Sequence, residues 1–215
     1  RLGWLDVASE MGVEVDRLDV FADALVADGI RHVVVMGMGG SSLFPEVLSR
    51  TFEPGDGFPR ITVLDTTDPD AIERVAAACD PEHAIVVVAS KSGSTIETRS
   101  HLEYFWARSP IGRQFIAITD PGSKMEQVAK DDGFRHIFYG KPQIGGRFSA
   151  LSAFGMTAAV SMGLDPNEFL KTASEMVNEC RNFGPDTCQL VGRVNDQDLA
   201  RLARRGEDCL RVQRF

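Results

Sequence analysis

The chain has 215 residues, and its 23 Lys and Arg against 31 Asp and Glu give a formal net charge of −8. With 43% hydrophobic residues it can bury a core of its own, and its length predicts one domain or slightly more. The acidic balance, without a basic run, argues against nucleic acid as the main partner. No apolar run approaches the roughly 20 residues that a membrane-spanning helix needs, so we expect no membrane partner.

Cysteine and histidine are sparse. The four cysteines show no CxxC spacing, and the four histidines are scattered, so we expect neither a disulfide framework nor a bound metal. This cysteine usage fits a cytoplasmic protein. The first ten residues lack the long apolar core of a signal peptide. Because the chain does not begin with Met, we expect it to be a piece of a longer protein.

Strands and helices alternate along the first 140 residues. The predicted strands are short apolar runs, typical of strands buried on both faces, at 32–36, 61–64, 84–89, 114–118 and 135–138. The predicted helices lie at 16–28, 42–52, 69–79, 95–107 and 124–132. Asp68 and Pro69 are expected to be the N-cap and first residue of the third of these helices.

This order predicts an α/β fold: a doubly wound, mostly parallel five-stranded sheet in a three-layer α/β/α sandwich. After residue 140 the pattern becomes a loop and two helices, 152–162 and 166–180, the second with Asp165 as its N-cap. We assign residues 1–180, including an N-terminal helical segment, to one domain. Residues 181–215 are expected to form a linker at 182–187, a helix at 195–204 and a strand at 210–212 that begins a second domain.

Two predicted loops at the carboxyl edge of the sheet, where ligands of such folds bind, are rich in Gly and Ser. GMGGSS, residues 37–42, follows the first strand. Its glycines allow backbone N–H groups to approach a ligand, and the next helix N-terminus favours an anion. SKSGST, residues 90–95, follows the third strand. Its hydroxyls, ammonium and glycine suit a phosphate held without a metal.

Each loop also has a plain structural interpretation. GMGGSS can be a tight turn, although a turn needs fewer glycines. Ser94 and Glu97 fit an S/T-x-x-E capping box, which is compatible with phosphate binding because both use the same free N–H groups. A third loop, GGRFS at 145–149, places Arg147 after two glycines. Arg147 can stabilise a phosphate or a developing oxyanion, or it is an ordinary surface arginine.

Two other classes of protein fit some of these features. A dinucleotide-dependent oxidoreductase would use GMGGSS and Asp65, but Ser42 stands where GxGxxG requires its third glycine, and residues 90–95 would have no role. A P-loop enzyme is excluded because no GK[ST] follows the glycine-rich turn. A non-catalytic module that senses sugar phosphates would use the same two loops without a base, and this alternative stays open.

Five motifs in chain order carry a resemblance to a known family. They are GMGGSS (37–42), LDTTDP (64–69), SKSGSTIET (90–98), ITDPGS (118–123) and GGRFSALS (145–152). Together they resemble the first sugar-isomerase (SIS) domain of phosphoglucose isomerase, over about residues 1–180. The opening RLGWLD resembles the isomerase part of bacterial transaldolase–phosphoglucose isomerase fusion proteins.

The resemblance implies that the longer protein interconverts glucose 6-phosphate and fructose 6-phosphate through a cis-enediol(ate), as in glycolysis and gluconeogenesis. It implies no metal or organic cofactor, and a homodimer of the full-length protein. The implied phosphate and sugar contacts are Ser90, Lys91, Ser92, Thr95, Gly40 and Ser41. The resemblance assigns Arg147 to the enediolate, and to Glu97 the role of a carboxylate beside a ring-opening histidine.

The family takes its general base from a Glu of a second SIS domain, and its histidine and lysine also lie there or later. None of that sequence occurs in these 215 residues. We therefore expect the chain to supply the phosphate site without the proton-transfer groups, and to have no meaningful isomerase activity alone. We also expect Phe154, Met162 and Phe169 to be partly exposed where a second domain would pack.

Overall fold

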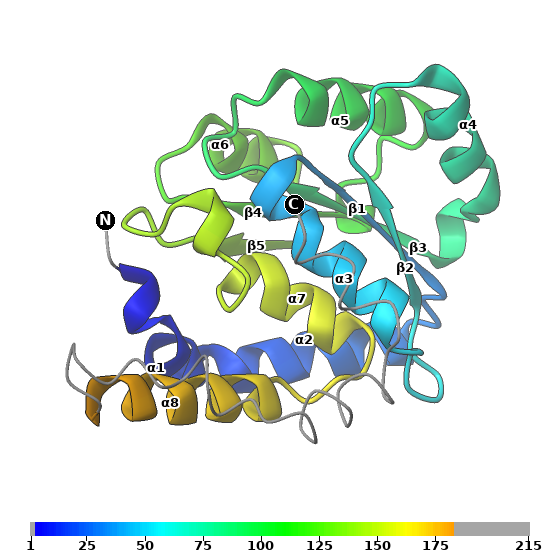
Figure 1. Cartoon of the computed structure of the whole chain (residues 1–215). Helices are drawn as coiled ribbons and strands as arrows, with labels where there is room; N and C mark the ends of the chain where they lie inside the picture. Colours follow the sequence, from blue (N-terminus) through cyan, green and yellow to red (C-terminus); the bar gives the residue numbers. More distant parts are fainter. Residues whose placement is uncertain (1–2, 183–215) are drawn as a thin grey trace.

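A five-stranded parallel sheet forms the centre of the molecule in the computed structural model, which describes residues 3–182 (Figure 1). Its strands are β1 (His32–Gly37), β2 (Arg60–Leu64), β3 (Ala84–Ala89), β4 (Phe115–Thr119) and β5 (His136–Tyr139). They are ordered β2-β1-β3-β4-β5, and every neighbouring pair is parallel. The predicted doubly wound sheet is confirmed, with strand bounds within one residue of those expected.

Helices connect the strands and cover both faces of the sheet. The α-helices are α1 (Val7–Met11), α2 (Val15–Ala27), α3 (Leu43–Thr51), α4 (Pro69–Ala78), α5 (Ile96–Arg108), α6 (Lys124–Asp131), α7 (Ala153–Ser161) and α8 (Pro166–Asn182). Short 3₁₀ helices are η1 (Gly3–Leu5), η2 (Gly12–Glu14), η3 (Gly39–Ser41), η4 (Pro81–His83), η5 (Gly112–Gln114) and η6 (Gly146–Phe148). The predicted caps are confirmed: the carboxylates of Asp68 and Asp165 accept from the N–H groups of Ala71 and Asn167.

The sheet separates two hydrophobic cores, because successive side chains of a strand point to opposite faces. In β1, Val33 and Val35 belong to one core, whereas Val34 and Met36 belong to the other. The first core includes residues of α1, α2, α3, α7 and α8, and the second includes residues of α4, α5 and α6. Figure 1 shows the sheet between these two groups of helices, which confirms the predicted three-layer sandwich.

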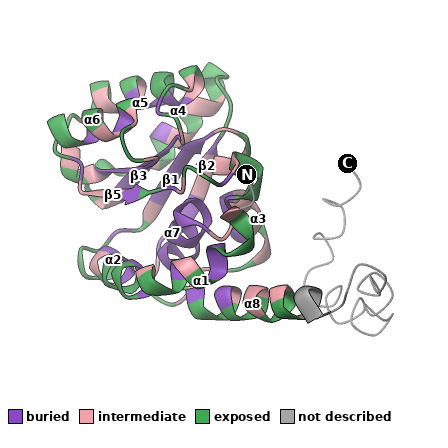
Figure 2. Cartoon of the chain, turned by 90° about the vertical axis from the view of Figure 1, so that its left-hand side faces the viewer, coloured by how far each residue is buried: buried purple, intermediate pink, exposed green. Residues whose placement is uncertain are grey.

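Helix α7 is buried along its whole length (Figure 2). Phe154 is 3% exposed and Met162, just after the helix, is 1% exposed. The expectation that these two side chains would be partly exposed is therefore wrong. The reason is that α2, α3 and α8 all contact α7. Phe169 is half-buried, with its ring edge-on to those of Phe44 and Phe52.

Three predictions fall at the end of the chain. Residues 183–187 of the expected linker lie outside the described residues, and so do the helix expected at 195–204 and the strand expected at 210–212. Asn182 ends α8. None of the helices within residues 3–182 is both long enough and apolar enough to span a membrane.

Candidate functional site

The strand order places the topological switch point of the sheet, where we expect a binding crevice, between the ends of β1 and β3. The chain runs from β1 outward to β2 on one side and then to β3 on the other, so the order reverses between β1 and β3. Ligands of open α/β sheets bind at such a switch point, outside the carboxyl ends of the strands. Gly37 at the end of β1 pairs with Ala89 at the end of β3. The loops at 37–42 and 90–95 therefore leave the sheet from neighbouring strands.

The loop after β1 folds into the tight turn η3 before α3 begins. Gly39 has φ +58°, a conformation that glycine adopts without strain. The buried Ser42 hydroxyl donates to the carbonyl oxygen of Gly39 at 3.1 Å. Gly40 and Ser41, the predicted sugar contacts, are both half-buried at this turn. The helix expected from residue 42 begins one residue later, at Leu43.

The third predicted loop packs against this turn, backbone to backbone. A Cβ atom on Gly40 would lie 2.0 Å from the carbonyl oxygen of Gly146 and 3.0 Å from the backbone nitrogen of Arg147. The buried Ser149 hydroxyl links the two turns, since its oxygen lies 2.6 Å from the carbonyl oxygen of Gly146 and 3.3 Å from that of Gly40. The fold thus brings the backbone of Arg147 to the GMGGSS loop, at the carboxyl edge of the sheet.

Aromatic side chains support the loop that carries Arg147. The Arg147 side chain is exposed, and its guanidinium carbon lies 5.9 Å from the centre of the Phe148 ring. Phe148 stacks on Trp4 with ring centres 5.4 Å apart. An ion pair of 2.7 Å joins Lys141, near the start of this loop, to Glu10 of α1. The N-terminal segment thus contributes to the site indirectly, a role that was not predicted from the sequence although Trp4 lies within RLGWLD.

The loop after β3 gathers hydroxyl groups at the start of α5. Ser90 is buried, and its hydroxyl donates to Oγ1 of Thr95 at 3.3 Å. The exposed Ser92 hydroxyl lies 2.8 Å from that of Ser94. Gly93 has φ +67°, and a Cβ atom there would lie 2.5 Å from the backbone nitrogen of Met125 in α6. The loop is therefore compact and rests directly on the next crossover helix.

The first turn of α5 offers free hydrogen-bond donors. Thr95 is the N-cap, and its side chain accepts no hydrogen bond from the helix backbone. Within residues 3–182, no acceptor takes a hydrogen bond from the N–H groups of Ile96, Glu97 or Thr98. These groups, together with the helix dipole, attract an anion. The predicted capping box is wrong, because Ser94 lies one residue outside the N-cap position and does not cap the helix.

Two predicted site residues, Glu97 and Lys91, differ in whether their charged groups are paired within the protein. The carboxylate of the half-buried Glu97, in the first turn of α5, has no hydrogen bond or ion pair with any other residue described in the structure. In contrast, the Lys91 ammonium lies 2.7 and 2.5 Å from the carboxylate oxygens of Asp120 and 2.8 Å from the carbonyl oxygen of Lys141. Lys91 is therefore paired within the protein. Asp120 had no predicted role, although it belongs to the ITDPGS motif.

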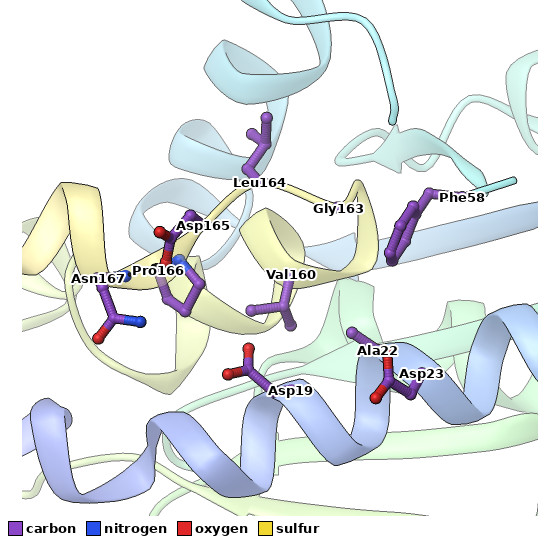
Figure 3. A pocket seen from close by; sticks show the side chains of 10 residues that line it. All are labelled: Asp19, Ala22, Asp23, Phe58, Val160, Gly163, Leu164, Asp165, Pro166 and Asn167. Carbon is purple, nitrogen blue, oxygen red and sulfur yellow. Dashed lines mark hydrogen bonds between the residues drawn. The ribbon is translucent and has the colours of Figure 1, made fainter. Parts of the chain in front are cut away.

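A cavity of about 380 Å³ lies elsewhere, between α2 and the connection from α7 to α8 (Figure 3). Asp19, Asp23 and Asp165 line it. Partial burial, together with the neighbouring carboxylates, raises the pKa of Asp19. The cavity contains none of the predicted site residues. Its negative charge disfavours a phosphate, so it does not compete with the loops at 37–42 and 90–95 as a phosphate site.

Comparisons with known proteins agree with the motifs. The family model of phosphoglucose isomerase matches residues 21–187. The chain is 38% identical over 187 residues to glucose-6-phosphate isomerase of a Cyanothece species, covering 80% of this chain and 35% of that protein. It is 40% identical over 159 residues to glucose-6-phosphate isomerase of Gloeothece citriformis, covering 70% of this chain and 30% of that one.

Two solved structures are also similar to this chain. A crystal structure of glucose-6-phosphate isomerase from Chlamydia trachomatis has a TM-score of 0.70 and 30% identity, covering 80% of this chain and 34% of that one. A hypothetical protein from Thermus thermophilus has a TM-score of 0.75 and 30% identity, covering 82% and 43%. This chain spans about a third of the length of the curated relatives it matches. Nothing in these findings favours the oxidoreductase alternative, and the chain belongs to the phosphoglucose isomerase family.

Proposed function

We propose that this chain forms the phosphosugar-binding part of a glucose-6-phosphate isomerase, which interconverts glucose 6-phosphate and fructose 6-phosphate. The observation that carries the proposal is the set of free N–H groups at the start of α5, next to the hydroxyls of Ser92 and Thr95. A phosphate dianion needs several convergent donors, and a helix N-terminus provides them without a metal. The names of the relatives support the same substrates.

The proposed arrangement divides the substrate between the loops. Ser90, Ser92 and Thr95 surround the phosphate, and Lys91 contributes its backbone N–H, which has no acceptor in the described part of the chain. The sugar extends across the crevice toward Gly40 and Ser41. This direction follows from the neighbouring positions of β1 and β3, because the two loops leave the sheet side by side.

Isomerisation requires a base that moves a proton between C2 and C1 of the open sugar, while negative charge builds on oxygen in the cis-enediolate. An arginine at the edge of the crevice suits this charge, because a preorganised cation stabilises it more in the transition state than in the ground state. Arg147 is the arginine that we assign to this role. Glu97 is the carboxylate that we assign to orienting the histidine that opens the ring.

We expect Thr95→Ala to weaken fructose 6-phosphate binding by about tenfold or more, because a hydrogen bond to a charged group contributes roughly 1.5–3 kcal/mol. Isothermal titration calorimetry on the 215-residue chain measures the affinity. Ser100→Ala is the matched control, since it removes a hydroxyl from an exposed position of α5 that makes no described hydrogen bond. Unchanged affinity in Thr95→Ala removes the loop from the site. Binding of NAD, without binding of fructose 6-phosphate, would indicate an oxidoreductase instead.

We expect Arg147→Ala to act mainly on the transition state. It should weaken binding of an enediolate mimic, a six-carbon phosphorylated hydroxamate, by about tenfold, and binding of fructose 6-phosphate by less than about threefold. Calorimetry with both ligands gives the comparison. Arg113→Ala, an exposed arginine before β4 at the opposite edge of the sheet, is the control. Equal losses for both ligands would make Arg147 a phosphate clamp.

Three further proposals concern the whole protein. They are a division between a domain at 1–180 and a second one beginning in 181–215, a homodimer of the full-length protein, and a cytoplasmic location. The first two are implied by the family resemblance, and the third is supported by the sparse cysteines. Sedimentation analysis of the full-length protein tests the dimer.

A further inference from the structure

The ammonium of Lys91 has no donor left for a ligand. A lysine ammonium carries three N–H donors. Three acceptors lie within 2.8 Å of Nζ: both carboxylate oxygens of Asp120 and the carbonyl oxygen of Lys141. These acceptors follow β4 and β5, whereas Lys91 follows β3. One side chain therefore connects the carboxyl ends of three neighbouring strands.

The backbone of Lys91 is held by the same turn. Its carbonyl oxygen accepts a hydrogen bond from the N–H of Asp120 at 3.0 Å and another from the Thr119 hydroxyl at 3.3 Å. The side chains of Lys91 and Asp120 are only 25% and 19% exposed. Water therefore screens this pair less than it screens a surface ion pair. The pair ties the phosphate loop to the turn between β4 and α6 through both side chain and backbone.

The backbone of Gly140 lies close to the carboxylate of Asp120. A Cβ atom on Gly140 would lie 2.6 Å from Oδ1 of Asp120, so the absence of a side chain at this position gives the carboxylate its room. Turning Lys91 toward a phosphate would leave Asp120 without its cation and the Lys141 carbonyl without its donor. A partly buried carboxylate that loses its cation is destabilised, which opposes such a turn of the Lys91 side chain.

We propose that Lys91 and Asp120 are positioning residues that hold the phosphate loop in its binding shape, and that the Lys91 ammonium is not a ligand of the phosphate. The inference rests on the proposed function, because it assumes that residues 90–95 bind the phosphate. In this arrangement the phosphate is recognised by N–H groups and hydroxyls, while the charge of Lys91 is neutralised by Asp120.

The two roles of Lys91 predict opposite effects of Asp120→Asn on affinity for fructose 6-phosphate. If Lys91 positions the loop, the substitution weakens its ion pair, distorts the loop and lowers the affinity by about tenfold. If the ammonium is a ligand, removing the competing carboxylate frees it and the affinity rises. Lys91→Met should also lower the affinity by about tenfold, and the double variant should lose little more than either single variant, because both disrupt the same pair.

Calorimetry on the 215-residue chain and its variants, well below the unfolding midpoint of each, makes the measurement. Asp28→Asn is the matched control: it removes the carboxylate of another ion pair, with Arg135 at 2.6 Å, at the opposite edge of the sheet, and should leave the affinity unchanged. If the unaltered chain binds neither fructose 6-phosphate nor glucose 6-phosphate, the proposed function fails. If it binds, and Asp120→Asn binds as tightly or more tightly, only the positioning role is overturned. Losses that multiply in the double variant overturn it as well.

A measurement on the unaltered chain decides the question if Asp120→Asn does not fold. Lysine labelled with ¹⁵N at Nζ reports by NMR on each ammonium as fructose 6-phosphate is added. A positioning role predicts no ¹⁵N–³¹P coupling across a hydrogen bond from the Lys91 ammonium, as for Lys130, whose ammonium pairs with Glu126 in α6. Such a coupling at Lys91 and not at Lys130 overturns the proposal.

Discussion

Gly40→Ala should lower the affinity of the chain for fructose 6-phosphate by about a hundredfold or more, because a misplacement of about 1 Å at a site can have an effect of this size. The added Cβ would lie 2.0 Å from the carbonyl oxygen of Gly146, which is backbone and cannot turn away. The turns η3 and η6 must therefore separate, which displaces Ser41 and Arg147 together. Overpacking of this kind also destabilises a fold by roughly 1–3 kcal/mol. Calorimetry measures the affinity, and urea unfolding measures the stability.

Gly146→Ala is the matched control for Gly40→Ala. It adds the same methyl group to the other side of the same contact, where a Cβ atom would meet nothing within 4 Å, and Gly146 does not have positive φ. Its affinity should stay within about threefold of that of the unaltered chain, in line with the small effects of open surface positions. Equal effects of the two substitutions would show that the contact between η3 and η6 does not shape the site.

The 215-residue chain should show no isomerase turnover above background, although we expect it to bind sugar phosphate weakly. Isomerisation requires a base beside a carbon-bound proton, and a positioned general base contributes typically about 10²–10⁴-fold. Glu97 is the predicted catalytic carboxylate in the first turn of α5, and we assign it to orienting a histidine rather than to proton abstraction. A coupled assay that converts fructose 6-phosphate to glucose 6-phosphate, with host isomerase removed, measures the turnover.

Glu97→Gln separates the two explanations if turnover is found. Loss of turnover in that variant would make Glu97 the base and would contradict its assignment as an orienting group. Turnover that survives in Glu97→Gln would point to another local base. Asp70→Asn, a carboxylate in the first turn of α4, is the control for the change of charge.

The strands of the sheet could be predicted because each one is specified by a short stretch of consecutive residues. Each strand is a short apolar run followed by a polar or glycine-rich turn, as at Ala84–Ala89, and buried parallel strands are distinctive for this reason. Helix starts were predictable where a short polar side chain accepts from the backbone, as at Asp68 and Asp165. The capping box was a wrong prediction because Ser90, Ser92 and Thr95 lie beside Ser94, and sequence does not show which of these hydroxyls a helix uses.

The parts of the site that could not be predicted depend on contacts between distant residues. Nothing near Gly40 in the sequence indicates that Gly146 lies against it. Similarly, the acceptors of the Lys91 ammonium follow two other strands, so sequence showed the cation without its anion. The burial of Phe154 was also missed, because the helices that cover α7 are spread along the chain. The motifs thus indicated which loops form the candidate site, while the charge pairing and close contacts of these loops could be found only from the fold.

The contact between Gly40 and the loop around Arg147 has a consequence for synthesis of the protein. Ser149, whose hydroxyl lies against the Gly40 carbonyl, follows it by 109 residues. At roughly 5–20 residues per second, a ribosome needs on the order of 5–20 s to make the stretch between them. During that interval the nascent chain holds the GMGGSS turn without its partner. A metabolite that binds both turns can stabilise only molecules that have passed this point, so its concentration would favour finished domains over partly made ones.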